Sequence, residues 1–111
     1  MQQNQNHFPY SVRKKIESIL KYSKVVLLGS GSHTRELLEC FPDLYKKTIA
    51  IYSPVKNVEE ISGIPVKPES ELKNEDYDAF LISSNPLEWD MCRRFIENKK
   101  TKKKIHLLYS S

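Results

Sequence analysis

The sequence predicts a single α/β domain built on a parallel sheet of about five strands, with helices flanking the sheet. Two observations carry this prediction: short uninterrupted apolar runs recur along the chain, and amphipathic helical patterns separate them. Apolar runs of this kind are typical of strands buried on both faces of a parallel sheet. The length of 111 residues fits one domain. We expect a flexible polar tail over residues 1–10 and the domain over residues 11–111.

An extra helix is predicted ahead of the first strand. Its apolar positions recur at helical spacing behind Ser11, the candidate N-cap: Val12, Ile16, Ile19 and Leu20. The first strand is the run Val25–Leu28, which Gly29 ends. A second helix follows with Leu37, Leu38 and Phe41 on its apolar face, and Pro42 is expected to end it.

Four further strands complete the predicted sheet. They are Thr48–Tyr52, the short piece Gly63–Val66, Ala79–Ile82 and Ile105–Tyr109. Pro65 cannot donate to a ladder, so its strand is expected at an edge or to begin there. One helical turn is expected at Pro68–Leu72, and a helix is expected after Asn85, which can cap it while Pro86 occupies its first position.

Composition and charge exclude several classes of protein. The net charge is +4, but the basic excess lies at the two ends: residues 1–24 hold five basic and one acidic residue, and residues 99–111 hold five lysines. Residues 25–98 hold eight basic and 13 acidic residues, which argues against a dedicated nucleic-acid fold. The longest aliphatic run has four residues, far below the about 20 that span a bilayer. We expect a cytoplasmic location and no transmembrane segment.

The segment Gly29-Ser30-Gly31-Ser32-His33-Thr34 is the main candidate for chemistry, because it stands between a buried strand and a helix. Gly29 would permit the tight turn, and Gly31 would let a phosphate approach the backbone. Thr34 stands where a third glycine is usual, so its hydroxyl could cap the helix or touch a ligand, or the helix could sit farther from the strand. A glycine-rich turn without a ligand is the alternative. His33, in the first helical turn, should be mainly neutral and could hydrogen-bond a ligand or act as a base.

Two other segments could complete a binding site at the carboxyl edge of the sheet. Tyr52-Ser53 ends the second strand, where a dinucleotide site usually has an acidic residue, so ordinary NAD binding is weakened. Tyr52 could stack on a base or pack at the sheet edge. Ser83, Ser84 and Asn85 follow the fourth strand at the same edge, although Asn85 could serve only as a helix cap. Cys40 and Cys92 fall on apolar helical positions and are expected to be buried; no catalytic residue and no metal site is predicted.

The order of these motifs resembles the small Rossmann-like domain found at the front of bacterial sugar O- and N-acyltransferases, and related domains attached to sugar methyltransferases and polysaccharide-biosynthesis proteins. The residues that carry the resemblance lie between Val25 and Tyr109: Leu27–His33 with Glu36-Leu37-Leu38, then Gly63–Val66, Pro68 with Glu71-Leu72, and Tyr77-Asp78. The family usually has an acidic pair where this chain has Ser53-Pro54, and the acyltransferase repeats are missing.

The resemblance implies a Rossmann-like module that binds a nucleotide or nucleotide-sugar, with its phosphates on residues 29–33, as an accessory to cell-surface sugar biosynthesis. The ligand itself is open, and a nucleotide-sugar or NAD(P) would fit. We expect no catalytic activity from the chain on its own, and a separate enzyme or a second copy of the chain as its partner. Two alternatives stay open: a protein-interaction or regulatory domain that lost its ligand, and a small NAD-dependent sugar-modifying enzyme.

Overall fold

The computed structural model describes residues 8–29, 32–53, 58–71, 77–82 and 105–108. The helix predicted after Asn85 lies outside these ranges. None of the helices in the described ranges is both long enough and apolar enough to cross a membrane. The elements, in chain order, are α1 (Tyr10–Ile19), β1 (Val25–Leu28), α2 (Ser32–Cys40), α3 (Pro42–Lys47), β2 (Thr48–Ser53), β3 (Glu60–Ile61), β4 (Ile64–Pro68), the 3₁₀ turn η2 (Glu69–Glu71), β5 (Ala79–Ile82) and β6 (Ile105–Leu107).

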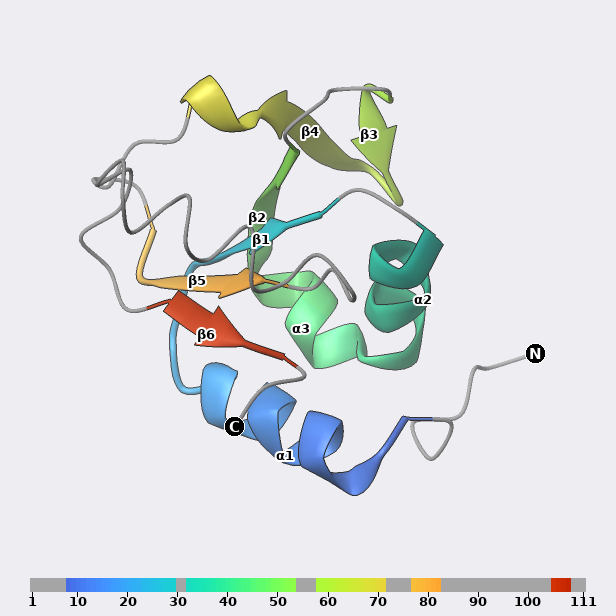
Figure 1. Cartoon of the computed structure of the whole chain (residues 1–111), viewed down its shortest axis with the longest axis vertical. Coiled ribbons are helices and arrows are strands. Elements are labelled where there is room, and N and C mark those ends of the chain that lie inside the picture. Colours follow the sequence, from blue (N-terminus) through green and yellow to red (C-terminus); the bar gives the residue numbers. More distant parts are fainter. Residues whose placement is uncertain (1–7, 30–31, 54–57, 72–76, 83–104, 109–111) are drawn as a thin grey trace.

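The strands form one six-stranded sheet in the order β3-β4-β2-β1-β5-β6 (Figure 1). Every pair of neighbours is parallel except β3 and β4, which form an antiparallel hairpin. The α/β class, the mostly parallel sheet and the flanking helices are therefore confirmed. The five predicted strands are all present, and β3 is an additional two-residue strand at one edge.

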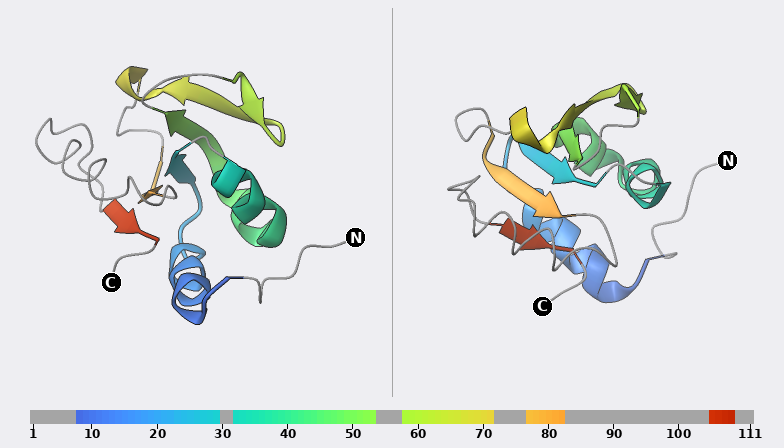
Figure 2. Two further views of the ribbon diagram at one scale, coloured as in Figure 1. Left: turned by 45° about the vertical axis from the view of Figure 1, so that its right-hand side comes forward. Right: turned by 45° about the horizontal axis from the view of Figure 1, so that its top comes forward.

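The sheet buries side chains on both faces, and alternate residues of each inner strand divide between two apolar clusters. Val25 and Leu27 of β1 belong to the larger cluster, which also contains the buried residues of α1, α2 and α3. Val26 and Leu28 belong to a smaller cluster, formed on the other face by residues of the strands and Tyr77. In the two views of Figure 2, α2 and α3 lie against one side of the sheet, with α1 next to β1, β5 and β6.

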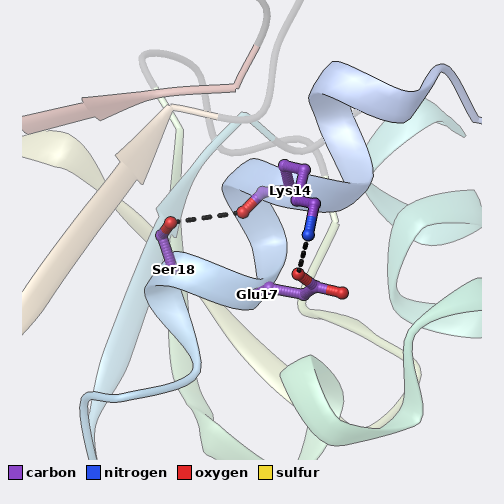
Figure 3. A network of polar contacts seen from close by, with 3 residues as sticks. All are labelled: Lys14, Glu17 and Ser18. Atoms are coloured by element: carbon purple, nitrogen blue, oxygen red, sulfur yellow. Dashed lines mark hydrogen bonds and ion pairs between the residues drawn. The ribbon is translucent and has the colours of Figure 1, made fainter.

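Helix α1 holds to the sheet through a stripe of fully buried residues: Val12, Ile16 and Ile19. Ser11 is not its N-cap, because the helix begins one residue earlier and Pro9 occupies the cap position. The outer face of α1 is polar (Figure 3): the Ser18 hydroxyl donates to the Lys14 carbonyl over 3.2 Å, and the Lys14 ammonium lies 3.3 Å from a Glu17 carboxylate oxygen. That contact raises the pKa of Lys14 above its usual range.

Pro42 ends one helix and begins the next. The prediction of a stop at Pro42 is correct, but α3 was not expected, because proline at the first helical position also starts helices. Leu44 anchors α3 in the larger cluster, and the Lys47 ammonium donates to the Leu20 carbonyl at the end of α1. Cys40 is buried as expected, and burial raises the pKa of its thiol.

The β3–β4 hairpin is turned by two residues with positive φ, Ser62 at 52° and Gly63 at 86°. The Tyr45 hydroxyl of α3 donates to the Ser62 carbonyl over 2.7 Å and ties the turn to the helix layer. Pro65 lies at the start of β4, before the pairing with β2 that begins at Val66, so its predicted place is confirmed.

Candidate functional site

The first residue after β1 is the glycine that opens the predicted turn. Gly29 follows directly on β1 with φ 121°, a conformation that favours glycine. Its N–H donates to the Tyr52 carbonyl over 2.8 Å, which extends the β1–β2 ladder by one residue. Helix α2 begins at Ser32, and its first turn contains no acidic residue. Because the N-terminal end of a helix is positive and presents N–H groups without intrahelical partners, this geometry suits an anion.

The strand order places this turn where the chain changes direction across the sheet. From β1 the chain proceeds to β2 and β4 on one side, and then crosses to β5 and β6 on the other side (Figure 1). In open α/β sheets, ligands bind outside the carboxyl ends of the strands at such a reversal. Leu28 pairs with Tyr52 and with Ile82, so Gly29 and Ser53 follow at the same edge of the sheet at which β5 ends.

Thr34 braces the turn from within. Its hydroxyl donates to the Gly29 carbonyl over 2.8 Å, and only 1% of the residue is exposed to solvent. Of the roles that the sequence left open for this hydroxyl, the structure shows a bond to the turn itself. The hydrogen bond holds the start of α2 against the end of β1, at the position where a third glycine is usual.

His33 lies in the first turn of α2 and is half-buried. Its imidazole meets the Phe8 ring edge-on, with 5.9 Å between the ring centroids and 64° between the planes. Burial lowers the pKa of His33, against an opposing effect of the Glu36 carboxylate. The direction of this pKa shift agrees with the neutral imidazole that the sequence predicts. The main cause of the shift is burial and not the helix dipole.

Tyr52 and Ser53 are both buried at the end of β2. Tyr52 packs near the carboxyl end of β2, a strand that lies between β1 and β4. The Tyr52 ring belongs to the smaller apolar cluster and lines a pocket on that face. Five other predicted site residues, Ser30, Gly31, Ser83, Ser84 and Asn85, lie outside the described residues, and of Ser32 only the helical backbone is described.

A pocket of about 290 Å³ lies between α1 and α3 and is lined by Arg13, Lys14, Glu17 and Asp43 together with apolar neighbours. It shares no residue with the turn after β1, and its lining combines two basic with two acidic side chains.

The second pocket, of about 410 Å³, lies on the face of the smaller cluster. We call it the β2–η2 pocket, and its lining is Val26, Ile49, Tyr52, Lys67, Ser70, Glu71 and Tyr77. Apart from Tyr52, none of these residues was predicted as a site residue, because they come from four segments that only the folded sheet brings together.

No protein-family model matches this sequence, and no curated protein matches it.

Proposed function

We propose that the chain is a Rossmann-like module that binds a nucleotide or nucleotide-sugar, with the phosphates at the turn between β1 and α2. The observation that carries the proposal is Gly29: it has a positive φ, lies three residues before the start of a helix whose first turn has no acidic residue, and lies where the strand order reverses. A phosphate at this point would accept hydrogen bonds from the backbone and interact favourably with the helix dipole.

The resemblance to the front domain of sugar acyltransferases favours a nucleotide-sugar over NAD(P). Ser53 at the end of β2 argues against NAD(P), because an acidic residue at that point is what holds the adenosine ribose in NAD-binding folds. On this proposal the chain presents a sugar nucleotide to a separate enzyme of cell-surface sugar biosynthesis and catalyses no reaction itself.

A thermal-shift titration tests the proposal. A ligand that binds the native state raises its stability by RT ln(1 + [L]/Kd), which is about 2.7 kcal/mol at a hundredfold excess over Kd. We expect a concentration-dependent rise in Tm with a uridine-diphosphate sugar, and a smaller rise or none with NAD, NADP, coenzyme A or S-adenosylmethionine.

Gly31→Asp should abolish the rise, because a carboxylate in the turn repels phosphate. Ser18→Asp adds the same charge on the exposed face of α1 and should leave the rise unchanged. A rise that survives Gly31→Asp would place the ligand elsewhere. No rise with any of the five ligands would favour the protein-interaction alternative, and turnover of a nicotinamide cofactor would favour the enzyme.

A further inference from the structure

The β2–η2 pocket is separate from the turn after β1 and has its own chemistry. It lies on the sheet face opposite α1, α2 and α3, since Val26, Tyr52 and Tyr77 all belong to the smaller cluster. Figure 1 shows η2 as the yellow turn after β4, on the far side of the sheet from α2. The volume of the β2–η2 pocket, about 410 Å³, falls within the range of about 300–1,000 Å³ that is usual for small-molecule sites.

The apolar side of the pocket lining, which we call its floor, consists of Val26, Ile49, Tyr52 and Tyr77. Ile49 is 41% exposed, although it lies in β2 with strands on both sides, and the neighbouring residues of that strand are buried. Tyr52 and Tyr77 also line the pocket but are only 7% and 3% exposed, so they offer little aromatic surface for stacking. A floor of this kind suits the C–H face of a saturated ring better than the face of a planar base, which would need an exposed aromatic ring.

The rim of the pocket is polar and carries one charge of each sign. Lys67 pairs with Tyr52 in the register of β4 and β2, so both side chains stand on the same face. Ser70 and Glu71 reach the rim from η2. Among the described residues, neither Lys67 nor Glu71 takes part in a salt bridge. The ammonium donates, the carboxylate accepts and the hydroxyl does both, so the rim can hydrogen-bond a ligand that has both donors and acceptors.

The balance of charge selects against an anion. A phosphate near Lys67 would also meet the Glu71 carboxylate, and two negative groups at close range repel each other. Neighbouring hydroxyl groups on a ring supply donors to Glu71 and acceptors to Lys67 without a net charge. We propose that the β2–η2 pocket binds a neutral sugar ring through its vicinal hydroxyls, with the ring's C–H face on Ile49. This inference goes beyond the proposed function, because it needs no phosphate at Gly29.

Amide chemical-shift mapping on the full chain tests the inference with defined probes. Two sources of the ring are distinguished by two ligands: uridine supplies a ribose, and methyl α-D-glucopyranoside supplies a hexose. We expect at least one of them to shift the amides of Ile49, Lys67, Ser70 and Glu71 in a saturable manner. 2′,3′-Dideoxyuridine lacks the vicinal hydroxyls and should bind at least tenfold more weakly than uridine.

Three variants complete the test. Glu71→Gln removes the acceptor charge and should weaken binding by about tenfold or more, because hydrogen bonds to charged groups are the stronger kind. Glu60→Gln makes the same change on an exposed edge residue outside the pocket and should leave binding unchanged. Ile49→Trp fills the floor and should abolish binding, while the dispersed amide spectrum confirms that the variant is folded.

The inference is overturned if neither ligand causes saturable shifts at these residues, if dideoxyuridine binds as well as uridine, or if Glu71→Gln binds like the parent chain. Gly31→Asp separates it from the proposed function. Loss of the nucleotide-sugar effect in Gly31→Asp, with binding of the free sugar ring retained, supports both sites. If the parent chain binds the sugar ring but binds none of the nucleotides, the proposed function is contradicted and the sugar site is supported.

Discussion

At the scale of single residues, Thr34 shows how this turn differs from a glycine-rich dinucleotide turn. A third glycine would let the helix approach the strand closely. Thr34 instead buries its side chain at this position, and its hydroxyl donates a hydrogen bond to the Gly29 carbonyl. The turn is therefore held by a side chain as well as by the backbone. This brace should affect both the stability of the fold and the binding of an anion.

Thr34→Val should lower the free energy of unfolding by about 1–2 kcal/mol, because it removes a donor from a carbonyl in a buried turn. Thr48→Val is the matched control: its hydroxyl is also buried and donates to the Leu44 carbonyl over 2.7 Å. Urea denaturation should give similar losses for both variants. Only Thr34→Val should weaken nucleotide-sugar binding, and an equal loss of binding in Thr48→Val would contradict a specific brace at the turn.

His33 makes stability depend on pH. Because its folded pKa lies below the unfolded value, the unfolded chain binds more protons as the pH falls, and protonation favours unfolding. Above the unfolded pKa of about 6.5, His33 is neutral in both states and protonation costs the fold no stability. As the pH falls through that value towards the folded pKa, the free energy of unfolding should decline. An NMR titration of the imidazole should give a midpoint below 6.5, and His33→Gln should flatten the dependence of Tm on pH between about 7.5 and 5. A midpoint above 6.5 would show that Glu36 outweighs burial.

At the scale of elements, α1 packs against the sheet through its apolar stripe. This stripe lies in the larger cluster, whereas the contacts among Lys14, Glu17 and Ser18 lie on the exposed face (Figure 3). Exposed ion pairs contribute little to stability, whereas buried aliphatic side chains contribute several kcal/mol. Substitutions on the buried face of α1 should therefore lower the stability of the protein, and substitutions on its exposed face should not.

Ile16→Ala should lower the free energy of unfolding by about 2–4 kcal/mol, because the side chain is almost completely buried. Glu17→Gln removes the partner of Lys14 and should leave the urea midpoint unchanged within error. A destabilisation by Glu17→Gln as large as that by Ile16→Ala would show that the polar face holds the helix.

The β3–β4 turn is another element whose stability can be tested. Ser62 and Gly63 both have positive φ, the pattern of a hairpin turn that favours Asn-Gly. Ser62→Asn should therefore raise the free energy of unfolding by about 0.5 kcal/mol, because asparagine tolerates this conformation better. Gly63→Ala should lower it by about 1 kcal/mol through backbone strain, since an added Cβ would meet only the Tyr45 hydroxyl, at an ordinary 3.7 Å. Thermal unfolding of the two variants should shift Tm in opposite directions.

The elements also show what sequence reasoning could reach. β1 and β5 were predicted with their observed limits because each is an uninterrupted apolar run that ends in a turn. β3 was missed because two residues with one charge form no pattern, and α3 was missed because Pro42 was interpreted only as a stop. The turn after β1 could be predicted because its residues are consecutive. The β2–η2 pocket could not, since Lys67 and Tyr77 meet Tyr52 only through the strand order.

At the scale of the whole molecule, β1 joins the two halves of the core. Its four residues alternate between the larger and the smaller cluster, and it lies between β2 and β5. Loss of either cluster would remove half of the packing around this strand. The two clusters should therefore unfold together.

Urea unfolding followed by far-UV circular dichroism and by the near-UV signal of the tyrosines should give coincident transitions. The first signal reports on the helices, which pack in the larger cluster, and the second includes Tyr52 and Tyr77 of the smaller cluster. Two separate midpoints would show that the faces of the sheet unfold independently.

The hairpin at one border of the sheet has a consequence for self-association. β3 offers only two residues to the outside, and its Glu60 carries an exposed charge. An incoming chain would find almost no ladder to extend at this border. Edge-to-edge pairing of strands from different molecules is therefore disfavoured at this border. We expect the protein to remain monodisperse at high concentration only while β3 stays short and keeps the charge of Glu60.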